Sequence, residues 1–83
     1  TEDIASQYGL SKGEGVVVIS VDRGSSAEDA GIMRGDIIHE INGRQIKNVS
    51  DFNEAVKTVE KNKQVVVLIE RGNSMLYLAF NVR

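Results

Sequence analysis

Hydrophobic and polar positions along the chain follow a period that changes from strand to helix and back. Apolar, mostly β-branched residues run without a break through Gly15–Ile19, and a second run of this kind lies within Gln64–Glu70. Such runs are typical of strands that are buried on both faces, so two buried strands are predicted. In the last segment, every second residue is strongly apolar, which predicts a final strand with one side on the core. These residues are Leu76, Leu78, Phe80 and Val82.

Helical spacing appears in the middle of the chain. A helix is predicted over about residues 50–60, with Ser50 as its N-cap, because four apolar residues recur on one face. These residues are Phe52, Ala55, Val56 and Val59. At the start of the chain, residues 1–9 predict a short helix that Gly9 can end.

The segment between the first strand and the middle helix carries several turn signals. Two N-cap hydroxyls, Ser25 and Ser26, precede a short helix that should start near Ala27 and end at Gly31. Gly35 and Asp36 are predicted to turn the chain into a strand over residues 36–41, with the Asp36 carboxylate accepting backbone N–H bonds. Two further turns are predicted. Asn42-Gly43 should precede a short return strand at 44–46, and Gly72-Asn73 should precede the last strand.

The predicted order of elements is helix, strand, short helix, two strands, helix, two strands. This order suits a mainly β fold with two main helices, built as a small, partly open β-barrel or sandwich whose ends the helices close. With 83 residues, the chain is predicted to form a single domain spanning 1–83, with a core of marginal size.

Composition limits the classes of function. A net charge of −2 gives no basic footprint for nucleic acid, and no apolar run approaches the ~18 residues of a membrane span. The chain has no cysteine, and its acidic residues show no metal-binding spacing, so no metal and no cofactor are predicted. Because the chain begins with Thr1 and shows no signal peptide, it is interpreted as a piece of a longer protein.

Catalytic chemistry is not predicted. His39 is the only histidine, and it stands in an alternating strand, where a solvent-facing position is expected rather than a role in a Ser-His-Asp triad. Gly72-Asn73-Ser74 matches the start of a serine nucleophile loop. However, Met75 and Leu76 follow where that loop needs two glycines, so a hairpin turn is expected there.

Three motifs at fixed offsets resemble the PDZ family. They are G-V-x-V-x-x-V from Gly15, G-S-x-A-x-x-A-G-I from Gly24 and x-G-D-I-I-x-x-I-N-G from Arg34. The match extends over about residues 5 to 83. A last strand that ends the chain, together with the Asp-Phe-x-x-Ala-Val helix from Asp51, is similar to the circularly permuted bacterial variant in HtrA/Deg-type envelope proteases.

The resemblance implies a peptide-binding site. PDZ domains bind the last residues of a partner as a strand beside a helix, which here implies a peptide-binding groove at Phe52, Val56 and Val59, although the same stripe can serve as core. Strand-edge pairing is expected at Val16, Val18 and Ile19. The residues Gln7-Tyr8-Gly9-Leu10 match the sequence pattern x-Φ-G-Φ of the family's carboxylate-binding loop, where Φ is a hydrophobic residue. The four residues before Gly15 cannot hold a strand and a reversal, so that loop and its strand are inferred to lie upstream of residue 1.

The implied function is a peptide- or protein-binding module, namely the regulatory substrate-recognition or assembly domain of an HtrA-type serine protease in the periplasm or cell envelope. Its partners would be protein C-termini or unfolded polypeptide segments, with possible self-association in an oligomeric protease. One alternative is a PDZ module of another membrane or tail-specific protease or of a secretion component. Another is a structural oligomerisation module without a ligand. The module itself would not be an enzyme.

Overall fold

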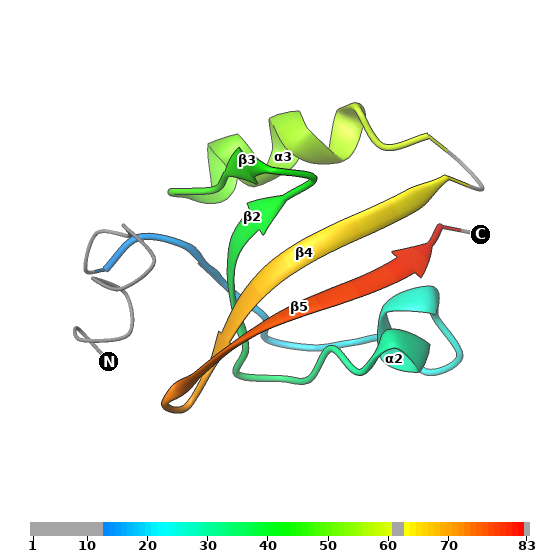
Figure 1. Cartoon of the computed structure of the whole chain (residues 1–83), viewed down its shortest axis with the longest axis horizontal. Coiled ribbons are helices and arrows are strands. Elements are labelled where there is room, and N and C mark those ends of the chain that lie inside the picture. The colour runs from blue at the N-terminus through cyan, green and yellow to red at the C-terminus, as the bar shows by residue number, and fades with distance from the viewer. Residues whose placement is uncertain (1–12, 61–62, 83) are drawn as a thin grey trace.

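A computed structural model describes residues 13–60 and 63–82, so the helix predicted for 1–9 lies outside the described residues. Its elements form one antiparallel sheet and two helices (Figure 1). In chain order they are β1 (Val16–Val17), α2 (Ser26–Ala30), β2 (Ile37–Ile41), β3 (Arg44–Gln45), α3 (Val49–Lys57), β4 (Gln64–Arg71) and β5 (Ser74–Asn81). This is the mainly β architecture that the sequence predicts.

The strand order in the sheet is β1-β2-β4-β5. β4 pairs with one edge of β2, and both β1 and β3 pair with the opposite edge. The central position of β4, predicted from its uninterrupted valines, is confirmed because β4 pairs with β2 on one side and with β5 on the other. Val65, Val67 and Ile69 of β4 join the core, while Leu68 is also fully buried but stands outside that cluster. The strand is therefore apolar on both faces, as a central strand should be.

Two predicted hairpin turns are confirmed. Asn42 and Gly43 both have positive φ, 51° and 82°, which is the geometry of a tight hairpin turn. The Asn42 side-chain oxygen also accepts the Val66 N–H at 2.8 Å, and the Asn42 N–H donates to the Val66 carbonyl at 2.7 Å. The turn is thus joined to β4 as well as to its own hairpin. At the other end of β4, Arg71 pairs with Ser74 across a two-residue turn.

Both helices have well-formed caps. Ser25 caps α2 by accepting the Glu28 N–H, and Gly31 ends it in the left-handed conformation, φ 98°, as predicted. For α3, the predicted cap is wrong: Asn48, not Ser50, accepts the Asp51 N–H at 2.9 Å. The Asp51 carboxylate accepts the Lys47 N–H at 3.0 Å in return. This reciprocal arrangement starts the helix two positions earlier than the Ser50 cap implied.

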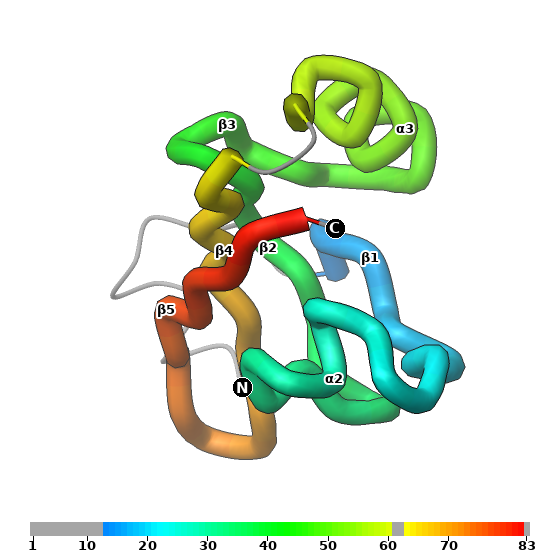
Figure 2. Tube along the Cα trace, turned by 90° about the vertical axis from the view of Figure 1, so that its right-hand side faces the viewer, coloured from blue at the N-terminus to red at the C-terminus, as the bar shows by residue number. Residues whose placement is uncertain are grey.

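The first strand differs from its prediction. β1 has only two residues, and Val17 and Ile19 are 56% and 80% exposed, so the segment is not buried on both faces. Its position explains this, because β1 stands at the edge of the sheet and pairs with β2 alone. Figure 2 shows α3 and α2 lying apart from each other, with β1 and the carboxyl end of the chain between them.

Candidate functional site

A cavity lined by described residues lies beside α3 and has a volume of about 620 Å³. One wall is α3, the opposite wall is the chain from Val18 to Asp22, and the floor is formed by β2, β4 and β5. A volume of this size falls within the range of roughly 300–1,000 Å³ that is usual for ligand sites. Most of its lining side chains are apolar.

The α3 wall is built from the predicted apolar stripe. Phe52, Val56 and Val59 all line the cavity, and Ala55 is fully buried beneath them. Val56 is 46% exposed, so part of the stripe meets solvent while the rest packs on the core. The structure therefore brings the three predicted groove residues together on one wall.

On the strand wall, one backbone edge has no partner strand among residues 13–60 and 63–82. The Val18 N–H donates to the Asp36 carbonyl at 2.8 Å, and the Val18 carbonyl accepts the Gly35 N–H at 2.8 Å. Since backbone groups alternate along a strand, those of Val16 also face β2, whereas those of Val17 and Ile19 face away from it. This differs from the predicted edge of Val16, Val18 and Ile19: Val16 and Val18 bond within the sheet, and the open positions are Val17 and Ile19.

The floor of the cavity is the hydrophobic core itself. Ile38, Ile41, Val65 and Val67 are buried residues of the core cluster, and they also line the cavity. Phe80 and Val82 close the floor on the β5 side, where the final alternating residues were predicted to face the core. A side chain that enters the cavity would therefore contact core residues directly.

One end of the cavity is polar. Ser20, Asp22 and Ser25 line it there, close to the start of α2. The Ser25 hydroxyl donates to the Asp22 carbonyl at 2.7 Å and accepts the Glu28 N–H at 3.1 Å. The backbone at this end is consequently held in place by the cap of α2.

The solvent-facing position predicted for His39 is wrong. The side chain is buried, with the residue only 3% exposed, and its Nε2 lies 2.9 Å from Glu70 Oε1 on β4. The pairing of β2 with β4 shifts register between Ile38 and Glu40, which interrupts the simple alternation on which the prediction relied. The backbone at Gly15 packs against the imidazole ring, since a Cβ built there would lie 3.2 Å from His39 Cε1.

Asp36 accepts a backbone N–H, as predicted, from Met33 at 2.8 Å. Sequence reasoning missed its second partner, Arg71, which donates from Nε and from Nη2 at 2.8 Å each. These hydrogen bonds from Arg71 hold the pKa of Asp36 below its usual value, against the opposing effect of burial. Asp36 is thus committed to a structural role and is not available to orient a catalytic histidine.

Neither a metal nor a membrane span is indicated by the described residues. Within 13–60 and 63–82, no group of three or more His, Cys, Asp and Glu side chains could hold a metal ion. In the same part of the chain, the helices are too short to cross a membrane.

A family model described as the PDZ domain matches residues 3–82. The DegP-like probable periplasmic serine endoprotease of Brucella suis is 40% identical over 68 residues, which cover 76% of this chain and 13% of that protein. Its counterpart in Rhizobium meliloti is 34% identical over 72 residues, covering 87% of this chain and 14% of that protein. The chain therefore spans only a small part of the length of these relatives.

Solved structures agree on the fold. The HtrA3 PDZ domain bound to a phage-derived ligand (FGRWV) is 28% identical, with a TM-score of 0.74 over 99% of this chain and 72% of that chain. The HtrA-type protease AlgW with a decapeptide has a TM-score of 0.74 at 24% identity, over 99% of this chain and 25% of that chain. At that identity the second likeness concerns the fold alone.

Proposed function

Because the chain belongs to the PDZ family, we propose that it is a peptide-binding module that captures exposed C-termini or unfolded segments for an HtrA-type serine protease of the cell envelope. Within that protease it acts as a regulatory or assembly domain. The protease activity belongs to another part of the protein, and the module contributes recognition only.

The observation that carries this proposal is the apolar cavity between α3 and the open strand edge. An extended segment that lies along α3 points alternate side chains into this cavity. Phe52, Val56 and Val59 contact these side chains from α3. The cavity thus supplies the apolar pocket of strand-addition recognition.

The relatives support the choice of ligand and of compartment. The HtrA3 PDZ domain is described with a phage-derived ligand bound, and the Brucella and Rhizobium relatives are named as periplasmic endoproteases. That a carboxylate-binding loop and its strand lie upstream of residue 1 stays a prediction. A longer chain that includes this segment should bind a peptide with a free C-terminus more tightly than the same peptide amidated.

A peptide titration followed by NMR tests the proposal. The ligand is a short peptide, acetylated and amidated at its ends, in which valine and phenylalanine alternate with serine. We expect shifts at residues that line the cavity, and Val56→Asp should weaken binding by tenfold or more, because it places a charge on the apolar wall. Val49→Asp is the matched control, since Val49 is also exposed on α3, at 62% against 46% for Val56, but does not line the cavity.

Two outcomes would contradict the proposal. One is an absence of peptide-induced shifts in the folded chain. The other is an equal loss of affinity in the Val56 and Val49 variants, because a loss that does not depend on the cavity wall would exclude the groove as the binding site.

A further inference from the structure

The helix α3 forms a wall of the cavity, although little of it is buried. Ala55 is the only residue of Val49–Lys57 that is fully buried, and Val56 on the cavity wall is 46% exposed. Side-chain packing alone therefore gives this helix a small contact with the core. Its place over the sheet depends on how its ends are attached, and the two ends differ.

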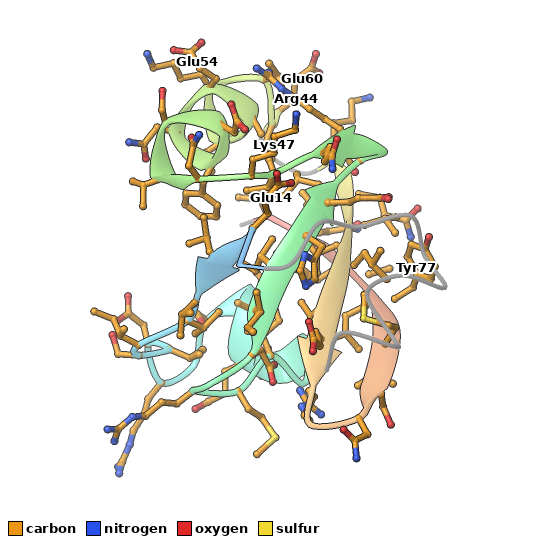
Figure 3. The ribbon with its side chains drawn as sticks, turned by 90° about the vertical axis from the view of Figure 1, so that its left-hand side faces the viewer. Glu14, Arg44, Lys47, Glu54, Glu60 and Tyr77 are labelled. Carbon is orange, nitrogen blue, oxygen red and sulfur yellow. The ribbon has the colours of Figure 1, made fainter. Side chains whose placement is uncertain are left out.

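The N-terminal end of α3 is tied to the sheet by two consecutive hydrogen bonds. The Asp51 carboxylate accepts the Lys47 N–H at 3.0 Å, and the Lys47 carbonyl accepts the Gly15 N–H at 3.0 Å. Figure 3 shows Lys47 just above Glu14, the residue that precedes Gly15. Lys47 thus joins the first turn of the helix to the chain that leads into β1.

Gly15 is a firm point of attachment. A Cβ built there would lie 2.7 Å from Ile37 Cγ2 and 3.2 Å from His39 Cε1, so its backbone is packed tightly against β2. The next residue, Val16, pairs with Ile38 of the same strand. A helix end that is bonded to Gly15 through Lys47 is therefore held at a set distance from the sheet.

The C-terminal end of α3 has no such attachment in the described part of the chain. The Thr58 N–H and hydroxyl both donate to the Ala55 carbonyl, at 3.1 and 2.7 Å, and the Val59 N–H donates to the Val56 carbonyl at 3.1 Å. These hydrogen bonds close the last turn of the helix on itself. Between residues 13–60 and 63–82, the polar contacts that tie α3 to the sheet thus lie at its N-terminal end.

We infer that Asp51 is a positioning residue for peptide binding, because its carboxylate holds α3 where Phe52 and Val56 can meet a bound side chain. Asp51 itself does not line the cavity. This inference rests on the proposed function and adds the residue that sets the place of the groove helix. A wall that is already held in place loses less freedom when a peptide binds, so the affinity should depend on this attachment.

Peptide titration of variants tests the inference. The ligand is again the acetylated and amidated peptide in which valine and phenylalanine alternate with serine. Asp51→Ala should weaken binding roughly fivefold, which is within the range found for residues that act on a site without contacting its ligand. Asp51→Asn keeps an oxygen that can accept the Lys47 N–H, so it should restore most of the affinity.

Asn48→Ala is the matched control. It removes the N-cap of the same helix, which accepts the Asp51 N–H at 2.9 Å, but it leaves the Asp51 carboxylate in place for Lys47. Both alanine variants should lower the melting temperature by a similar amount and still fold, because loss of a helix cap costs far less than the stability of a domain. Only Asp51→Ala should lose affinity. Circular dichroism checks that each variant is folded.

Hydrogen exchange of the Gly15 amide reports the attachment directly, since this N–H donates to the Lys47 carbonyl. Exchange at Gly15 should be faster in Asp51→Ala than in Asn48→Ala, because only the first variant frees Lys47 from the helix. A role for Asp51 in helix stability alone would change both variants equally.

The possible failures are distinguishable. Three results overturn this inference and leave the proposed function standing: undiminished affinity in Asp51→Ala, an equal loss of affinity in Asn48→Ala, or equal Gly15 exchange in the two variants. If the folded parent chain does not bind the peptide, the proposed function fails and the inference fails with it.

Discussion

Arg71 and Asp36 join two distant parts of the chain. The guanidinium donates from Nε and Nη2 to the two oxygens of the Asp36 carboxylate, at 2.8 Å each, and Nη2 also donates to the Gly31 carbonyl at 2.7 Å. Asp36 is almost fully buried, whereas the Arg71 side chain is about one third exposed. The pair fixes the end of β4 against the turn that leads from α2 into β2.

Arg71→Ala should lower the free energy of unfolding by about 2–4 kcal/mol, because it leaves a buried carboxylate without its cation. Arg71→Lys should recover only part of this loss, since an ammonium cannot donate in the forked geometry of a guanidinium. Urea denaturation measures both. Arg44→Ala, at an exposed strand position, should change stability by less than about 0.5 kcal/mol. Equal effects at Arg71 and Arg44 would show that the buried pair does not stabilise the fold.

Acid should weaken the fold through the same pair. Hydrogen bonds from Arg71 lower the pKa of Asp36 from its ordinary value of 3.8, so the folded state favours the ionised carboxylate. The resulting stabilisation is complete above the ordinary pKa and is lost as the pH falls through the lower, folded-state pKa. Stability measured from pH 6 downward should therefore fall less steeply in Asp36→Asn than in the parent chain. Parallel acid profiles would count against this assignment.

Ser26→Pro should be neutral or stabilising by up to ~1 kcal/mol. Ser26 is the first helical residue of α2, where no N–H bond is needed, and Ser25 has the extended conformation, φ −76° and ψ 159°, that precedes proline well. Thermal unfolding gives the measurement. In contrast, Ser25→Ala should cost about 1 kcal/mol, because it removes the N-cap. A clear fall in melting temperature for Ser26→Pro would mean that this N–H or hydroxyl has a partner.

Gly15→Ala should destabilise the domain by roughly 2 kcal/mol or more. The added Cβ would lie 2.7 Å from Ile37 Cγ2 and 3.1 Å from the Ile38 carbonyl oxygen, and φ at this position is +118°, so the change combines overpacking with backbone strain. Gly13→Ala separates these causes, since Gly13 also has positive φ, +80°, but nothing lies within 4 Å of its Cβ position. Equal losses in both variants would attribute the effect to the backbone alone.

The open edge at Val17 and Ile19 should support weak self-association in the 83-residue chain, because an uncovered apolar strand edge is a pairing site for another chain. Sedimentation velocity should show a concentration-dependent increase in mass, and Ile19→Lys should abolish it. Met33→Lys, at another exposed apolar position, should not. Amide exchange that is slow and independent of concentration along both edges of 15–21 would mean that the chain fills this edge itself.

Local sequence signals predicted the parts of the fold in which short-range geometry decides the outcome. Asn42-Gly43 adopts positive φ at both residues, and Gly31 ends α2 in the left-handed conformation, because few other residues take these conformations at low cost. The apolar stripe of α3 was also readable, since helical spacing alone places Phe52, Val56 and Val59 together. Whether each of them faces solvent or the core depends on what packs opposite.

The errors occur where distant residues decide. His39 is buried because a register shift disturbs β2 and because Glu70, thirty-one positions away, supplies a partner. In the same way, the sequence around the Asp36 turn does not indicate that Arg71, thirty-five positions away, is its ion-pair partner. Val17 and Ile19 have the composition of a strand buried on both faces, but both are exposed because nothing among the described residues packs on that side of the sheet edge. The pattern of side chains along a segment predicts that it forms a strand, but which strands pair with it depends on the topology of the whole sheet.

Because the hydrophobic core also forms the floor of the cavity, ligand binding is coupled to the stability of the fold. Ile38, Val65 and Val67 belong to the core cluster and also line the cavity, so a bound side chain completes the packing that the empty domain leaves open. Ligand should therefore raise the melting temperature, with a gain of about 2.7 kcal/mol at a hundredfold excess over Kd. By the same reciprocity, a conservative core change such as Val67→Ala should weaken ligand binding without touching the exposed wall.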